Sequence, residues 1–399
     1  MKTFGIVCEY NPFHSGHLYH INESRRLGAE AVVCVMSGNF VQRADFAMTD
    51  MHSRAESAVR NGADLVIQLP TPWVLSSAEK FAFGAVYILN ALGVVTHLSY
   101  GAENPETDMH IKAARLLMSA DFPLKLTDRL KTGVSFASAR YSALAEIDSA
   151  AAEVLRNPNN ILAVEYIKAL TQLGSDIIPV AVERRGSMHD EMTTENEHIS
   201  ATAIRKLLLS GDFEEVSGFL PRETCNILLR EIKNKNAPVW IKDADKAMLS
   251  CLKKLSAEDY LRFNDVSEGL EKRLYRAVSR AVSLDEAVML AKTKRYTHSR
   301  IRRIYLSAFL GATKDLSSGA PGFARILAFN DTGRKLIAKI RKKSEIPVIT
   351  KPAAVKKTSA DALRLFEFES RATDLYSLFK PEPSVGGSEW LKKPVYTEM

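Results

Sequence analysis

The sequence predicts an α/β fold, in which a doubly wound sheet of five parallel strands is followed by a mainly helical C-terminal half. Short apolar runs alternate with segments of helical spacing in the first half of the chain, which is typical of parallel strands joined by crossover helices. After about Pro221 the strand signals stop and helical spacing takes over. We therefore expect one α/β domain over 1–220 and a helical domain over 221–399.

The expected strands are apolar runs bounded by turn residues. They span Phe4 to Cys8, Ala31 to Met36, Asp64 to Leu69, Val94 to Tyr100 and Ile177 to Val182. In open α/β sheets, ligands bind beyond the carboxyl ends of the strands. The loops that follow these strands, at 9–17, 37–43, 101–104 and 183–190, are therefore the candidate binding loops.

The first of these loops carries two histidines where a helix is expected to begin. Asn11-Pro12 ends the strand, and His14, Gly16 and His17 follow it. A helix N-terminus attracts anions through its free N–H groups and dipole, and imidazoles there add hydrogen-bond donors. Two surface histidines flanking a glycine by chance would be a serious rival if these residues stood alone. The preceding strand and turn favour a phosphate site.

A second helix start has the same character. Ser200 is expected to cap a helix whose apolar face includes Ile204, which leaves Thr202 and Arg205 near its N-terminal end. An ordinary capped amphipathic helix is the simpler interpretation of these residues alone. After five strands and the histidine pair, a second phosphate-binding helix start is the favoured one.

Three further positions lie in or near the candidate loops. Gly101 would let a nucleotide approach the main chain after the fourth strand. Asn160 lies at a helix start, where an asparagine often serves as a cap. Arg184 and Arg185 follow the fifth strand, where positive charge would complement phosphate, and either could make the contact.

Basic residues gather in the second half. The formal net charge is +7, and the stretch from Lys292 to Lys314 contains no acidic residue. Its basic side chains include Lys294, Arg295, Arg300, Arg302 and Arg303, and the last three lie off the apolar stripe of a helix, so we expect them to face outward. A solvated basic face is the usual meaning of such a helix. The lack of acids and the nearby aromatics favour RNA backbone binding.

The composition excludes several classes of protein. Of the 399 residues, 46% are hydrophobic, and no apolar run is long enough to span a membrane, so we expect a soluble cytoplasmic protein. The four cysteines are widely spaced, which predicts neither disulfides nor a metal site. The residues after Pro381 have few core signals, and we expect a loosely held tail.

The pattern His-x-Gly-His after a first strand is the signature of the adenylyl-transferring nucleotidyltransferases. With the second motif, the loop from Asn39 to Arg43, and the stretch from Thr293 to Thr297, nearly the whole chain resembles the tRNA(Met) cytidine acetate ligase family. That resemblance implies a Rossmann-like nucleotidyltransferase domain and a helical part that holds tRNA. It implies that ATP, with Mg²⁺ expected alongside it, activates acetate as acetyl-adenylate. The acetyl group would then pass to the N4 amine of the wobble cytidine of elongator tRNA(Met), forming N4-acetylcytidine.

The resemblance also implies roles for individual residues. Catalytic roles fall to His14, His17 and Arg205. ATP contacts fall to Ile6, Val7, Cys8, Glu9, Tyr10, Asn11, Pro12, Phe13, His14, Ser15, Gly16, His17, Leu18, Gly101, Asn160, Arg184, Arg185, Ser200, Thr202 and Arg205. Contacts with tRNA fall to Lys294, Arg295, Arg300, Arg302 and Arg303. Neither a metal held by the protein nor a protein partner is implied.

Two alternatives remain open from the sequence. An adenylyltransferase acting on a small phosphorylated cofactor precursor would share the histidine motif but would not need the basic helical half. A nucleotide-binding RNA adaptor without catalysis would keep that half. Met51 supports this second alternative, because we expect a lysine at this position in relatives.

Overall fold

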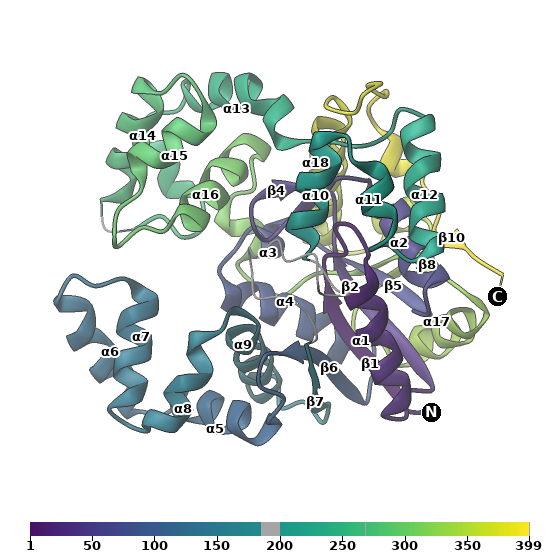
Figure 1. The fold of residues 1–399 in the computed structure, drawn as a ribbon, viewed down its shortest axis with the longest axis horizontal. Coiled ribbons are helices and arrows are strands. Elements are labelled where there is room, and N and C mark those ends of the chain that lie inside the picture. Colours follow the sequence, from purple (N-terminus) through teal and green to yellow (C-terminus); the bar gives the residue numbers. More distant parts are fainter. Residues whose placement is uncertain (185–199, 268, 399) are drawn as a thin grey trace.

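The computed structural model describes residues 1–184, 200–267 and 269–398 (Figure 1). At its centre, five parallel strands lie in the order β5-β2-β1-β6-β7. Their bounds are β1 Thr3–Cys8, β2 Ala31–Ser37, β5 Leu65–Leu69, β6 His97–Ala102 and β7 Ile178–Glu183. These are the five expected strands, and the predicted doubly wound parallel sheet is confirmed. The strand order reverses at β1, so the ligand crevice is expected at its carboxyl end.

Alternate residues of the strands support helices on both faces of the sheet. In β2, Cys34 and Met36 belong to the apolar cluster under α1 and α2, whereas Val33 and Val35 belong to the larger cluster on the other face. The helices that follow the strands are α1 Ser15–Arg26, α2 Met51–Arg60, α4 Ala78–Ala91, α5 Thr107–Leu117 and α9 Pro158–Gln172. Burial of both faces explains why the central strands β1 and β2 are mainly apolar, whereas the edge strand β7 is mostly half-buried or exposed.

Shorter elements fill the connections of this first part. A small hairpin, β3 Phe40–Val41 and β4 Asp45–Phe46, follows β2, and a short helix, α3 Thr71–Val74, follows β5. Between α5 and α9 the chain forms α6 Asp121–Lys131, α7 Phe136–Ala145 and α8 Ser149–Glu153. In Figure 1, α6 and α7 project away from the sheet beside one another.

The second half is mainly helical. Its helices are α10 Ala201–Ser210, α11 Phe213–Ser217, α12 Arg222–Lys233, α13 Asp245–Leu252, α14 Leu270–Arg280, α15 Leu284–Ala291, α16 His298–Leu310, α17 Asp331–Lys343 and α18 Ala360–Ser377. Helices α13 to α16 gather into one group at the upper left of Figure 1. Helix α10 lies near the N-terminus of α1, which places the start of the second half at the ligand end of the sheet.

The prediction that strands stop near Pro221 is wrong, because the C-terminal half returns to the same sheet. Strand β8 (Ala324–Phe329) pairs antiparallel with β5 and covers its open edge. Two short strands, β9 (Val348–Ile349) and β10 (Val395–Tyr396), run parallel to β8. A short run that is apolar apart from Arg325 is compatible with either a buried strand or part of a helix, so periodicity alone does not identify β8.

The expectation of a loosely held tail is also wrong. Glu389 is 3% exposed and forms an ion pair with Arg325 of β8, which is equally buried. The Trp390 ring packs edge-on against Phe366 with 4.7 Å between ring centroids. Beyond β10, the Thr397 amide donates to the Phe329 carbonyl at 3.1 Å. These contacts fix the tail across the edge of the sheet.

In the part of the chain that the structure describes, no helix is long and apolar enough to cross a membrane.

Candidate active site

The histidine motif closes the turn after β1 by capping α1 with its own rings. His14 is the N-cap residue, and its Nδ1 accepts a hydrogen bond from the Gly16 amide at 3.1 Å. The His17 Nδ1 accepts one from the His14 amide at 3.2 Å. Because each Nδ1 is an acceptor, this hydrogen-bond pattern assigns the ring proton to Nε2 in both histidines. The pair therefore offers two N–H donors at the carboxyl end of β1.

The environment keeps His17 neutral at physiological pH. Burial lowers the pKa of His17 well below its ordinary value, and the nearby His14 and Arg184 lower it further. Burial, with a contribution from Arg184, also lowers the pKa of His20 to about 4. Neutral His17 can donate a hydrogen bond to phosphate through Nε2, while Arg184 supplies the positive charge.

The second motif lies beside the first. The Arg205 Nη1 donates to the Asn11 carbonyl at 2.8 Å, in the loop that leads to His14. The Ser200 hydroxyl caps α10 by accepting from the Ala203 amide at 3.2 Å. Thr202 Oγ1 accepts from Arg205 Nη2 at 3.4 Å. The N-termini of α1 and α10 thus meet at one edge of the sheet.

Gly101 and Arg184 adjoin this edge from β6 and β7. A Cβ added to Gly101 would lie 3.1 Å from the Arg184 Cγ, so the glycine allows the arginine to lie against the strand. The two residues are therefore neighbours, as expected for strands paired in register. Arg185 lies outside the described residues.

Asn160 fixes the loop after β6 through hydrogen bonds to its backbone. It is 1% exposed, and its Oδ1 accepts from the backbone amides of Glu103 and Asn104 at 3.0 and 3.3 Å. The Glu103 carboxylate in turn accepts from the Asn160 amide at 3.0 Å and from Asn159. In this structure Asn160 positions the loop of Gly101, and its expected contact with nucleotide stays a prediction.

Three guanidinium groups approach one another at the site. Burial lowers the pKa of Arg184 and of Arg205, and the positive charge of Arg43 lowers both further. Cations that disfavour one another in a partly dry site are stabilised when a polyanion binds among them. Arg43 was not among the predicted site residues, although it lies at the end of the candidate loop after the second strand.

Comparisons with known proteins agree with this geometry. The family model described as HIGH Nucleotidyl Transferase matches residues 1–388. A tRNA(Met) cytidine acetate ligase from Caldanaerobacter subterraneus subsp. tengcongensis is 39% identical over 385 residues, 95% of each chain. One from Clostridium perfringens is 38% identical over 414 residues, 99% of each chain.

The chain belongs to the tRNA(Met) cytidine acetate ligase family.

A solved structure from the same family extends the likeness to the fold. The structure of Thermotoga maritima TmcAL bound with alpha-thio ATP superposes with a TM-score of 0.94 at 33% identity, covering 100% of both chains. The predicted fold class, a nucleotidyltransferase-like parallel sheet followed by a mainly helical part, is therefore confirmed. None of these comparisons assigns a role to a single residue, so the site residues of this family member remain predictions.

The basic residues expected to contact tRNA divide into two groups. Lys294 and Arg295 are exposed in the loop before α16. Arg300 is half-buried, and its Nε and Nη2 donate to the Asp265 carbonyl at 2.9 and 2.7 Å. Lys294 and Arg295 are therefore more exposed to solvent than Arg300.

The expectation that Arg302 and Arg303 face outward is wrong. Arg303 is 13% exposed and pairs with Asp265 at 3.6 Å. Arg302 is 19% exposed, pairs with Asp285 at 3.7 Å and donates to the Ala44 carbonyl at 3.4 Å. The acids that neutralise them lie outside the acid-free stretch of sequence, so local composition did not reveal them. Their contact with tRNA stays a prediction.

Met51, where a lysine is expected in relatives, is the first residue of α2. It is 1% exposed and packs in the apolar cluster with Cys34 and Met36. In this chain the position therefore contributes to the core.

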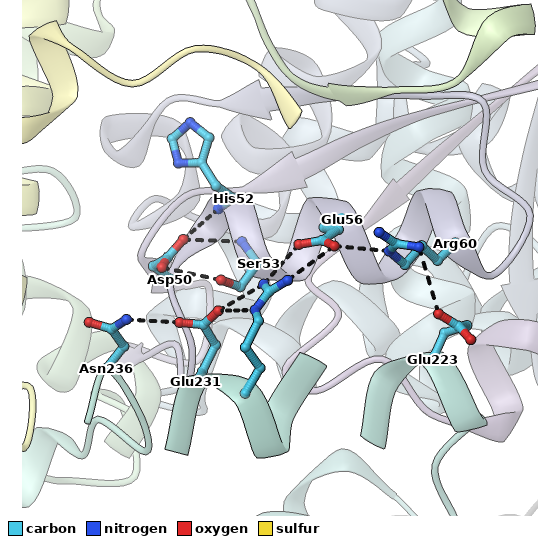
Figure 2. Close-up of polar contacts among 9 residues, drawn as sticks. Asp50, His52, Ser53, Glu56, Arg60, Glu223, Glu231 and Asn236 are labelled. Atoms are coloured by element: carbon cyan, nitrogen blue, oxygen red, sulfur yellow. Dashed lines mark hydrogen bonds and ion pairs between the residues drawn. The ribbon is translucent and has the colours of Figure 1, made fainter. Parts of the chain in front are cut away.

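A second polar cluster joins α2 to α12 (Figure 2). Asp50 caps α2 through the His52 and Ser53 amides, and Arg230 of α12 pairs with Glu56 and Glu231, each at 2.8 Å. These residues line a cavity of about 230 Å³. Because Arg230 neutralises both glutamates, we interpret the cluster as a clamp between the two helices.

Proposed function

We propose that the protein uses ATP to activate acetate as acetyl-adenylate and transfers the acetyl group to the N4 amine of the wobble cytidine of elongator tRNA(Met). The products would be N4-acetylcytidine, AMP and pyrophosphate, formed in the cytoplasm. Family membership supports the overall reaction. The observation that carries the site assignment is the hydrogen bond from Arg205 to Asn11, because it brings two helix N-termini to the carboxyl end of β1.

Acetate is a poor acyl donor because its leaving group would be an oxide. In the first step an acetate oxygen attacks the α-phosphorus of ATP and expels pyrophosphate. Negative charge then builds on the phosphoryl and pyrophosphate oxygens. The Nε2–H groups of His14 and His17 and the guanidinium of Arg205 are donors suited to that charge, and no covalent enzyme intermediate is needed.

In the second step the cytidine amine attacks the acetyl carbonyl carbon and AMP leaves. Sequence-specific RNA recognition favours unpaired loops, where a base can be turned out, and an anticodon loop offers this. The exposed Lys294 and Arg295 would contact the RNA backbone. Selection of the elongator tRNA is thus assigned to the helical half.

The described residues do not form a magnesium cage, since no group of three or more His, Cys, Asp or Glu among them has metal-site geometry. Magnesium accompanying ATP would be held mainly by phosphate oxygens and water. We assign it no step.

The direct test supplies ATP, labelled acetate and total tRNA, followed by digestion of the RNA to nucleosides. We expect label in N4-acetylcytidine that depends on both ATP and acetate. In a parallel reaction with ATP labelled at the α-phosphate and no RNA, transfer of labelled AMP to a small phosphorylated compound would instead indicate an adenylyltransferase for a cofactor precursor. RNA binding without any ATP turnover would indicate a non-catalytic adaptor.

The site is tested by His17→Ala. Removing one preorganised donor from the developing charge typically costs about 10²-fold to 10³-fold in rate, so acetate-dependent ATP–pyrophosphate exchange should fall by that amount. The lost ring also removes one cap hydrogen bond, which costs only about 1 kcal/mol of stability. A folded variant, shown by circular dichroism, with normal exchange would refute the assignment.

A further inference from the structure

Transfer of the acetyl group to the N4 amine releases a proton that a group in the site must accept. The inference that follows rests on the proposed function. When the N4 nitrogen of cytidine bonds to the acetyl carbon, it carries one hydrogen too many. An exocyclic aryl amine is a weak nucleophile, so a base positioned to take that proton as the bond forms would accelerate the step.

The motif histidines are unsuited to this role. In both rings Nδ1 already accepts a backbone amide, and Nε2 carries the proton. The His20 Nε2 is hydrogen-bonded to the Ser99 hydroxyl at 2.9 Å. The guanidinium groups of the site are donors only. An acceptor must therefore be a carboxylate.

Two carboxylates near the cluster are engaged elsewhere. Both oxygens of Glu103 accept hydrogen bonds from the start of α9. Asp45 lies on the β4 strand of the hairpin, where its Oδ1 accepts from the adjacent Phe46 amide at 2.9 Å. Glu103 follows β6 and Asp45 lies on the hairpin after β2, so neither extends from the end of β1, and the charge of Asp45 instead supports the guanidinium of Arg205.

Glu9 lies at the carboxyl end of β1. It directly follows the last residue of β1 and is half-buried, between the buried Cys8 and Tyr10. Its Oε1 accepts from the Gln42 amide at 2.5 Å, which fixes the side chain. No hydrogen bond from the described residues reaches Oε2, so that oxygen is available as an acceptor on a partly exposed group.

The groups around Glu9 shift the pKa of its carboxyl group in opposite directions. Burial raises the pKa of Glu9, and the positive charges of Arg43, Arg54 and Arg205 oppose that rise. These arginines come from the loop after β2, from α2 and from α10, while Tyr166 faces the carboxylate from α9. The carboxylate can thus be ionised near neutral pH and yet be more basic than a solvated glutamate.

We propose that Glu9 is the general base of acetyl transfer. The N4 nitrogen forms a bond to the acetyl carbonyl carbon, and one N4 proton passes to Oε2 of Glu9. The bond between that carbon and the phosphate oxygen breaks, and AMP leaves with the electron pair. Glu9 then returns its proton to solvent, which restores the carboxylate.

The test separates the two half-reactions in Glu9→Gln, which keeps an oxygen to accept the Gln42 amide. Transfer is followed in single turnovers with chemically prepared acetyl-adenylate and elongator tRNA(Met). We expect transfer to fall by about 10²-fold or more, and by at least about tenfold more than acetate-dependent ATP–pyrophosphate exchange, in which Glu9 contributes only an ATP contact. In the unmodified protein we expect the transfer rate to rise with pH as Glu9 loses its proton, and this rise should disappear in Glu9→Gln. Glu106→Gln, the same substitution at an exposed glutamate that makes no cap hydrogen bond before α5, is the matched control and should alter neither reaction appreciably.

Each other outcome has a defined meaning. Equal losses in exchange and transfer would assign Glu9 to positioning the site and overturn the proposal. Transfer within tenfold of the unmodified protein, or an unchanged pH profile, would also overturn it. Absence of acetate-dependent exchange in the unmodified protein would instead refute the proposed function.

Discussion

The side chain of Arg54 links the loops that build the site, and its replacement by methionine should destabilise the fold. Arg54 is 2% exposed. Its guanidinium donates to the carbonyls of Glu9 and Gly38, to Ser37 at 3.1 Å and, through Nε, to Thr49 at 3.2 Å. Three of these carbonyls lie at the carboxyl ends of β1 and β2. No ion pair with a described carboxylate accompanies them.

The magnitude follows from these contacts. A hydrogen bond to a charged group contributes about 1.5–3 kcal/mol, so four contribute about 6–12 kcal/mol. Removing the buried charge recovers several kcal/mol of desolvation. We expect a net loss of about 4 kcal/mol in the free energy of unfolding, a large part of the stability of an ordinary domain.

Urea unfolding, followed by circular dichroism, measures this loss. Arg60→Met is the matched control, because Arg60 lies on the same helix but is 40% exposed, and its buried partner Glu56 keeps its ion pair with Arg230, so the loss should stay below about 1 kcal/mol. Arg54→Met with stability within about 1 kcal/mol of the unmodified protein would refute the reasoning. Because Arg54 holds the main chain of both loops, ATP–pyrophosphate exchange and acetyl transfer should fall together, unlike in Glu9→Gln.

Three further predictions concern nucleotide, RNA and pH. Gly101→Ala should crowd Arg184 and raise the KM for ATP by about tenfold, with melting temperature as the control; an unchanged KM would contradict this contact. Lys294→Glu with Arg295→Glu should weaken tRNA binding and lower its salt dependence while leaving exchange intact, and unchanged affinity at moderate salt would contradict the RNA assignment. Burial lowers the pKa of His52 to about 4, so the unfolded chain binds a proton below about pH 6.5 that the folded chain resists. Stability should therefore fall by about 2 kcal/mol from pH 7 to pH 5, and His52→Gln, measured by urea unfolding, should show a smaller fall.

The parallel sheet could be predicted because its signal is local. Strands buried on both faces are continuous apolar runs, and helices of regular spacing separate them. The strand boundaries follow less directly from the sequence, which predicts the fourth strand from Val94 to Tyr100, whereas β6 spans His97–Ala102. Valines at 94 and 95 pack against the core from the preceding loop, and apolar character alone does not separate such residues from a strand.

Features that depend on distant partners could not be predicted. Strand β8 is identified by its pairing with β5, far earlier in the chain. Arg303 faces inward because Asp265 neutralises it, and no pattern within α16 reveals that acid. The meeting of the two nucleotide motifs was predictable in outline from the rule for parallel sheets, but the hydrogen bond that joins Arg205 to Asn11 was not.

The late arrival of β8 has a consequence for synthesis of the chain. Roughly 250 residues separate β5 from β8, so a ribosome adds the covering strand about 10 to 50 s after the strand that it covers. During that interval β5, whose five residues are all buried in the finished molecule, presents bare backbone amides and carbonyls. The nascent chain, or a fragment cut near residue 220, would expose the unpaired edge of β5, which favours aggregation or chaperone binding.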